Sequence, residues 1–154
     1  MALFGGLRHL HLIVSDVERS ARFYETAFGM RRLGAKAPGE RVVLASRGLR
    51  DQLSLSRGRA GGEVDHYEAR AGAPGGVDHF GFVVSPFGNF ERAIKRVVAA
   101  GGRFIERADL GPFAPNAYLR DPDGYILQIY RFPSAAGVLA PLFELLRRLG
   151  LAPA

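Results

Sequence analysis

Apolar residues follow a similar pattern twice along this chain. In the first half, an apolar run over residues 9–14 precedes a stretch in which apolar residues recur at helical spacing. Ser15 or Asp16 can cap the start of this helix, and Gly29 can end it in a left-handed conformation. Strand-like stretches follow at 41–46 and 52–56, and the second of these alternates apolar and polar residues. The apolar positions of the expected helix are Val17, Ala21, Phe23, Tyr24, Ala27 and Phe28.

The second half repeats this order. An apolar run over 79–84 precedes an expected helix that Asn89 caps and that the pair Gly101 and Gly102 closes. Strand-like stretches follow at 103–106, 117–120 and 125–132. The turn Asp121-Pro122-Asp123-Gly124 joins the last two, because proline presets its φ angle and glycine accepts a positive one. The apolar positions of this helix are Phe90, Ala93, Ile94, Val97 and Val98.

Each half therefore predicts strand, helix and three strands, and the two opening histidines, His9 and His79, lie 70 residues apart. We expect one α+β domain made of two βαβββ modules that form a cup-shaped mixed sheet. Module 1 covers about 7–57, a Gly- and Arg-rich linker about 58–76, module 2 about 77–132, and a helical tail about 138–150. The apolar stripe of the tail suits packing on the body or on a partner chain better than a membrane role.

Composition narrows the function classes. The 154 residues fit one domain, and 47% apolar with 23% charged residues is typical of a globular protein. With no cysteine, disulfides, zinc–thiolate sites and cysteine nucleophiles are excluded. No segment is apolar enough for a membrane span, and the first residues lack a secretory signal, so we expect a soluble, cytoplasmic protein. The net charge of +6 comes from scattered arginines, which favours a solvated surface over nucleic-acid binding and would attract an anionic substrate.

The candidate chemistry lies at matched positions of the two modules. His9 and His79 open the first strand of each module, and Gln128 lies in the final strand. If the modules pair about a pseudo-twofold axis, these three side chains converge and could hold a divalent metal ion. By the same counting, Ser54 projects inward from the last strand of module 1. His11 shares a face with His9 and is either an acid/base for proton transfer, or a hydrogen-bonded cavity residue or alternative metal ligand.

Three aromatic positions and one further histidine have two interpretations each. Tyr118 and Tyr130 could line the cup and orient a substrate, or they could be core aromatics. His66 and Tyr67 lie in the linker, where surface placement is the default and a lid contact to ligand is the sharper alternative.

The motifs resemble those of the vicinal oxygen chelate superfamily, which includes glyoxalase I, extradiol dioxygenases, fosfomycin-resistance thiol transferases and bleomycin-resistance proteins. The resemblance covers about residues 7–132. It rests on His9 to Asp16 followed by Ser20, Phe23-Tyr24 and Gly29, on His79 to Phe82, and on Asp121 to Gly124 followed by Leu127-Gln128. The family usually carries a metal-binding glutamate where this chain has Gln128. The glutamine keeps an oxygen donor but removes a charge, which weakens metal binding and argues against an oxygen-activating ferrous site.

The resemblance implies a metal-dependent enzyme of the glyoxalase or dioxygenase type. Such an enzyme would bind a small molecule through vicinal oxygens and stabilise an enolate-like anion with Zn, Ni, Mn or Fe. The alternatives are a metal-free, bleomycin-resistance-type sequestering protein and a fosfomycin-type thiol transferase, which the run Leu53 to Arg57 superficially fits. We also expect a homodimer, because modules of this kind expose strand edges that another module covers.

Overall fold

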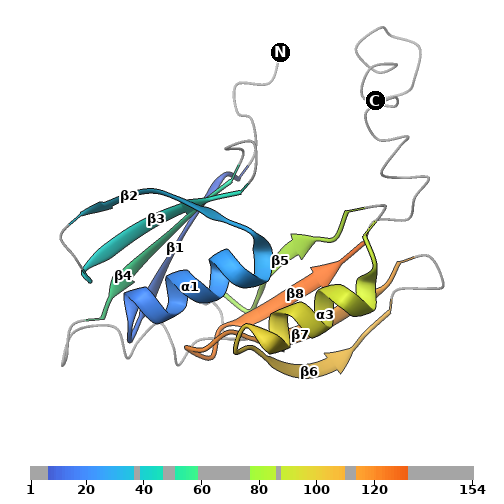
Figure 1. The fold of residues 1–154 in the computed structure, drawn as a ribbon. Helices are drawn as coiled ribbons and strands as arrows, with labels where there is room; N and C mark the ends of the chain where they lie inside the picture. Colours follow the sequence, from blue (N-terminus) through green and yellow to red (C-terminus); the bar gives the residue numbers. More distant parts are fainter. Residues whose placement is uncertain are drawn as a thin grey trace, which may run out of the picture.

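The structure is a computed structural model that describes residues 7–36, 39–46, 51–58, 77–85, 88–109 and 114–131. Figure 1 shows its elements along the chain. Module 1 comprises β1 (His9–Val14), α1 (Val17–Phe28), β2 (Arg31–Lys36), β3 (Arg41–Ala45) and β4 (Gln52–Arg57). Module 2 comprises β5 (Phe80–Val83), α3 (Phe90–Ala99), β6 (Arg103–Arg107), β7 (Asn116–Arg120) and β8 (Ile126–Tyr130).

Both helices begin at a side-chain cap. Asp16, not Ser15, caps α1 and accepts a hydrogen bond from the Arg19 amide at 3.0 Å. Gly29 ends that helix with a φ of 68°, a conformation that an L side chain would strain. Asn89 caps α3 in the same way, accepting from the Arg92 amide at 2.8 Å. The expected positions of both helices are confirmed.

The strands form two separate four-stranded mixed sheets, ordered β1-β4-β3-β2 and β5-β8-β7-β6. In each sheet the first and last strands of the module run parallel, and the other neighbours run antiparallel. The α+β class and the two βαβββ modules are confirmed, and the described sheets do not close into a barrel. The sequence did not locate β2, whose arginines and register shift near Gly34 hide its alternation.

The two modules meet through their helices. In Figure 1, α1 and α3 lie side by side, each covering one face of its own sheet. The Phe28 ring, at the end of α1, stacks on the Phe82 ring of β5 with 3.8 Å between centroids. One apolar cluster runs from Leu12 and Tyr24 in module 1 to Leu127 and Ile129 in module 2. The other face of each sheet, which its helix does not cover, is called the open face below.

Polar contacts hold the β7–β8 turn against module 1. The Asp123 carboxylate accepts hydrogen bonds from the Ser15 amide at 2.9 Å and the Ser15 hydroxyl at 2.6 Å, and a further one from the Ser20 hydroxyl. It also pairs with Arg19 at 2.6 Å. Burial opposes ionisation of Asp123, but the hydrogen bonds from Ser15 and Ser20 outweigh it and hold the pKa below its usual value. We use the name polar seam for the residues that make these contacts between the modules, which are Ser15, Arg19, Ser20, Tyr24, Asp121, Asp123 and Tyr125.

The rest of the polar seam surrounds Asp121. Its Oδ2 atom accepts the Tyr24 hydroxyl at 2.7 Å, and its Oδ1 atom accepts the amides of Asp123 and Tyr125. Burial raises the pKa of Asp121, whose side chain lies between the modules. The Tyr125 hydroxyl donates to the Ile13 carbonyl at 2.8 Å, satisfying the backbone of the exposed edge of β1. The β7–β8 turn is thus a hairpin, as expected, and also a contact between modules.

Some expectations fall outside the described residues. These are most of the linker, including His66 and Tyr67, and the helical tail. No helix in the described part of the chain is long and apolar enough to cross a membrane.

Candidate functional site

His9 and His11 lie together on the open face of sheet 1. Alternation along β1 directs Leu12 and Val14 into the core and leaves both histidines exposed on the opposite face. Their ring centroids are 6.4 Å apart. The structure therefore confirms that His9 and His11 share one face, as the two-residue spacing predicts.

Two side chains that sequence reasoning missed surround His11. Its Nε2 atom lies 2.8 Å from the Ser56 hydroxyl of β4. Arg41 of β3 is the register partner of Ser56, so the two lie on the same open face. Partial burial, the Arg41 charge and His9 together lower the pKa of His11. The imidazole is therefore predominantly neutral at pH 7 and able to accept a proton. The alternation of β3 and β4 carried the signal that would have placed Arg41 and Ser56 here.

Ser54, which we expected to line a substrate site, is the register partner of His11 but is only 1% exposed. In a single chain its neighbours on the open face cover it. Its hydroxyl could reach a ligand only if those side chains moved, so its role stays a prediction.

The open face of sheet 2 carries the second group of candidate residues. Tyr118 and Gln128 are register partners in β7 and β8, and the His79 ring meets the Tyr118 ring edge-on at 5.2 Å. Tyr130 lies two residues beyond Gln128 on the same face, and all four side chains are half-buried. The structure thus gathers His79, Tyr118, Gln128 and Tyr130 on one surface, and their role in lining a substrate site stays a prediction.

Gly81 shapes that surface. A Cβ atom at this position would lie 2.8 Å from Cε1 of Tyr130 and 3.2 Å from Oε1 of Gln128. The absent side chain therefore lets the tyrosine ring and the amide oxygen lie across β5. Gly81 belongs to the motif His79 to Phe82 that resembles the family, but the sequence alone predicted no role for it.

Asp78 contacts the imidazole of His79. The carboxylate Oδ2 lies 2.7 Å from Nδ1 of the imidazole. A carboxylate on one ring nitrogen favours the tautomer whose other nitrogen, Nε2, has a free lone pair, and metal-binding histidines are commonly held in this way. The sequence contains this Asp-His pair, but the pair alone predicts no function for the aspartate.

In a single chain, the metal site that we expected is divided between two surfaces. His79 and Gln128 lie on the open face of sheet 2, whereas His9 lies on that of sheet 1. Among the described residues, no contact joins His9 to His79, and no three His, Cys, Asp or Glu side chains could hold an ion together. The donors themselves suit a divalent ion, with two imidazoles and one amide oxygen. The open face of sheet 1 thus carries one of the three expected metal ligands, and that of sheet 2 carries the other two.

A family model described as the Glyoxalase/Bleomycin resistance protein/Dioxygenase superfamily matches residues 6–129. The chain belongs to this superfamily. The match spans both modules up to residue 129, so the resemblance noted in the sequence is confirmed. No curated protein is similar enough in sequence to count as a match.

Solved structures of the superfamily share the fold at low identity. A glyoxylase/bleomycin resistance protein/dioxygenase domain from Frankia sp. EAN1pec is 24% identical, covers 86% of this chain and 95% of its own, and has a TM-score of 0.66. The fosfomycin resistance protein FosX from Mesorhizobium loti is 18% identical, with coverages of 88% and 99% and a TM-score of 0.61. Lactoylglutathione lyase from Agrobacterium tumefaciens is 19% identical, with coverages of 84% and 96% and a TM-score of 0.59. These solved structures share the fold of this chain, while the reaction has to be argued from the site.

Proposed function

We propose that this protein is a divalent-metal-dependent enzyme of the glyoxalase type, acting on a small molecule that presents two adjacent oxygens. His9, His79 and Gln128 would be the metal ligands. The contact between Asp78 and His79 carries this proposal, because a surface histidine with a purely structural role does not need a carboxylate that frees its Nε2 lone pair. A divalent ion such as Zn, Ni, Mn or Fe would supply Lewis-acid polarisation of the substrate oxygens.

We further propose that a second copy of the chain completes the site. The described modules meet through their helices and the polar seam, which leaves both open faces uncovered. A homodimer in which sheet 1 of one protomer faces sheet 2 of its partner would bring His9 to His79 and Gln128. Such a dimer would contain two equivalent sites.

The remaining residues of the open faces would bind and process the substrate. His11, hydrogen-bonded to Ser56, would accept a proton from the substrate carbon beside the polarised oxygen. Tyr118 and Tyr130 would orient the substrate through their rings and hydroxyls. The Nε atom of Arg41 is buried and has no hydrogen-bond partner among the described residues, which suits a substrate with an anionic group.

Gln128 supports one alternative, a metal-free protein that sequesters a small molecule. A neutral amide attracts a cation less than the carboxylate that the family usually has there, and the half-buried tyrosines could hold an organic ligand by contact alone. This alternative predicts that ligand binding survives the loss of His9 and His79.

Metal content separates the two functions. The wild-type protein would be purified without added metal or chelator, and its metal measured by mass spectrometry and then by calorimetric titration with Zn²⁺, Ni²⁺, Mn²⁺ and Fe²⁺. We expect binding that His9→Ala and His79→Ala each weaken strongly, together with isomerisation of a hemithioacetal of a 2-oxoaldehyde or a related substrate. Wild-type protein that binds none of these ions below millimolar concentration would favour the sequestering function.

Mixing the two single variants tests the shared site. If the donors come from different protomers, a dimer of one His9→Ala chain and one His79→Ala chain has one intact site and one doubly altered site. Random mixing should then restore about a quarter of the sites, because half of the dimers are mixed. If all donors came from one chain, no site would be restored.

A further inference from the structure

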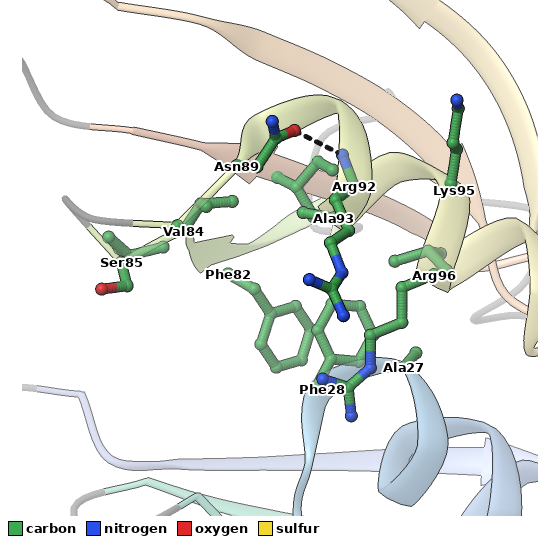
Figure 2. A pocket seen from close by; sticks show the side chains of 14 residues that line it. Ala27, Phe28, Phe82, Val84, Ser85, Asn89, Arg92, Ala93, Lys95 and Arg96 are labelled. Atoms are coloured by element: carbon green, nitrogen blue, oxygen red, sulfur yellow. Dashed lines mark hydrogen bonds between the residues drawn. The ribbon is translucent and has the colours of Figure 1, made fainter.

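A cavity lies away from the open faces, between the end of α1 and the start of α3 (Figure 2). Its volume is about 860 Å³, within the range of small-molecule sites. Phe82 and Ile129, which line it, point to the helix-covered side of sheet 2, opposite to Gln128. A molecule bound here would therefore not touch the candidate metal ligands.

The floor of this cavity is apolar. Phe28 and Phe82 stack there with an interplanar angle of 16°, and Val97 and Ile129 are each 1% exposed. Ala93 projects into the same space from the first turns of α3 (Figure 2). Such a floor suits an alkyl chain or an aromatic ring, whose transfer from water contributes about 25 cal/mol per Å².

The rim of the cavity is cationic. Arg92, Lys95 and Arg96 line it, and the guanidinium groups of Arg92 and Arg96 point toward the phenylalanine pair, whereas Lys95 points away (Figure 2). Arg96 donates from Nε to the Thr26 carbonyl at 2.6 Å, so it has a structural partner at the end of α1. The Arg92 side chain has no hydrogen bond or ion pair within the described part of the chain.

We propose that this cavity binds a small amphipathic carboxylate. The apolar body would lie on Phe28 and Phe82, and the carboxylate would pair with Arg92, whose planar guanidinium matches it with two parallel hydrogen bonds. The start of α3 adds a partial positive charge near the rim. The same charges disfavour a cationic ligand, and the basic residues of the C-terminal segment, Arg147 and Arg148, make that segment a poor occupant.

Octanoate is a suitable probe, and octanamide is its neutral counterpart. Calorimetry and amide chemical shifts would measure binding of both to the wild-type protein and to three variants. Arg92→Gln removes the unpaired cation, Ala93→Leu fills the cavity, and Arg22→Gln makes the matched charge change on the exposed face of α1. Thermal unfolding would check that each variant folds.

We expect octanoate to shift the amides of α3 and of the end of α1, and octanamide to bind weakly or not at all. Arg92→Gln and Ala93→Leu should each weaken octanoate binding at least about tenfold, or about 1.4 kcal/mol, and Arg22→Gln less than about twofold. Equal binding to wild type and Arg92→Gln overturns the proposal, as do shifts confined to the open faces. If α3 proves to be protected by a second copy of the chain and octanoate has no effect, the cavity is a subunit contact and the proposal also fails.

Discussion

Asp123 should be among the most sensitive polar positions of the fold. Its side chain is 3% exposed and accepts hydrogen bonds from Ser15, Ser20 and Arg19 across the boundary between the modules. Asp123→Asn preserves the shape but removes the charge. One carboxylate oxygen becomes an NH₂ group, which must donate to an oxygen instead of accepting from it.

The expected cost follows from the kind of bond that is changed. A hydrogen bond to a charged group contributes about 1.5–3 kcal/mol and a neutral one about 0.5–1.5 kcal/mol. In Asp123→Asn, several hydrogen bonds lose their charged acceptor. The contribution of the Arg19 pair is small because solvent screens a side chain that is 43% exposed, so the free energy of unfolding should fall by about 2 kcal/mol. For a chain of 154 residues this corresponds to a fall in Tm of about 4–8 °C.

Chemical and thermal unfolding at pH 7 would measure this loss. Asp16→Asn is the matched control, because Asp16 is exposed and asparagine caps a helix as well as aspartate does. The control should change the free energy of unfolding by a few tenths of a kcal/mol at most. Equal stability of the two variants would refute the importance that we assign to the polar seam.

The pH dependence gives a second check on Asp123. Its folded pKa is lowered, so its stabilisation is complete above the unfolded pKa of about 3.9 and is lost as the pH falls through the folded value. The difference between wild type and Asp123→Asn should therefore shrink below about pH 4. Asp121, whose pKa is raised, contributes with the opposite sign but is present in both proteins, so its effect largely cancels. A difference that stays constant down to pH 2 would contradict this reasoning.

Three further predictions concern the open faces. Gln128→Glu should tighten divalent metal binding at least about tenfold and Gln128→Ala should loosen it, as measured by calorimetry, because a carboxylate attracts the ion through its charge. Gly81→Ala should displace Tyr130 or the Gln128 amide oxygen and weaken the same binding, while costing only about 1–2 kcal/mol of stability. In the metal-free protein, the NMR titration of His11 should have its midpoint below 6.5, and Arg41→Gln should raise it. An unchanged midpoint would exclude Arg41 as a cause of the shift.

The sequence predicted the parts of the fold that depend on local physics. Helix caps act over three or four residues, which is why Gly29 and Asn89 could be assigned from their neighbours and the start of α1 narrowed to Ser15 or Asp16. Strand β2 was not located because its register shifts next to Gly34 and its side chains are mostly charged or small. The pattern of apolar residues is informative only where one face of an element is buried continuously.

The sequence predicted which residues form the candidate site, but it did not predict the charges and hydrogen bonds that act on the two histidines His11 and His79. Ser56 and Arg41 act on His11 from neighbouring strands, and their effect depends on register, which is set by pairing over many residues. Asp78 was overlooked for a different reason. Beside a histidine in sequence, an aspartate is usually a solvated charge, and only the 2.7 Å contact distinguishes it from one.

Whether His9 and His79 converge depends on contacts between residues that lie still farther apart in the sequence. Equivalent positions in a repeat place His9 and His79 alike within their own modules, but they converge only if the correct open faces meet. The orientation of the modules depends on contacts such as Tyr24 with Asp121 and Tyr125 with Ile13, which join residues 97 and 112 positions apart. In the sequence, the turn that contains Asp121 predicted a hairpin and formed part of the family resemblance, but it predicted no contact with module 1. Because these contacts orient the two described sheets of one chain, the residues that stabilise the fold also shape the surfaces that the proposed dimer would join. Variants that loosen the polar seam should therefore weaken metal binding even though they touch no proposed ligand.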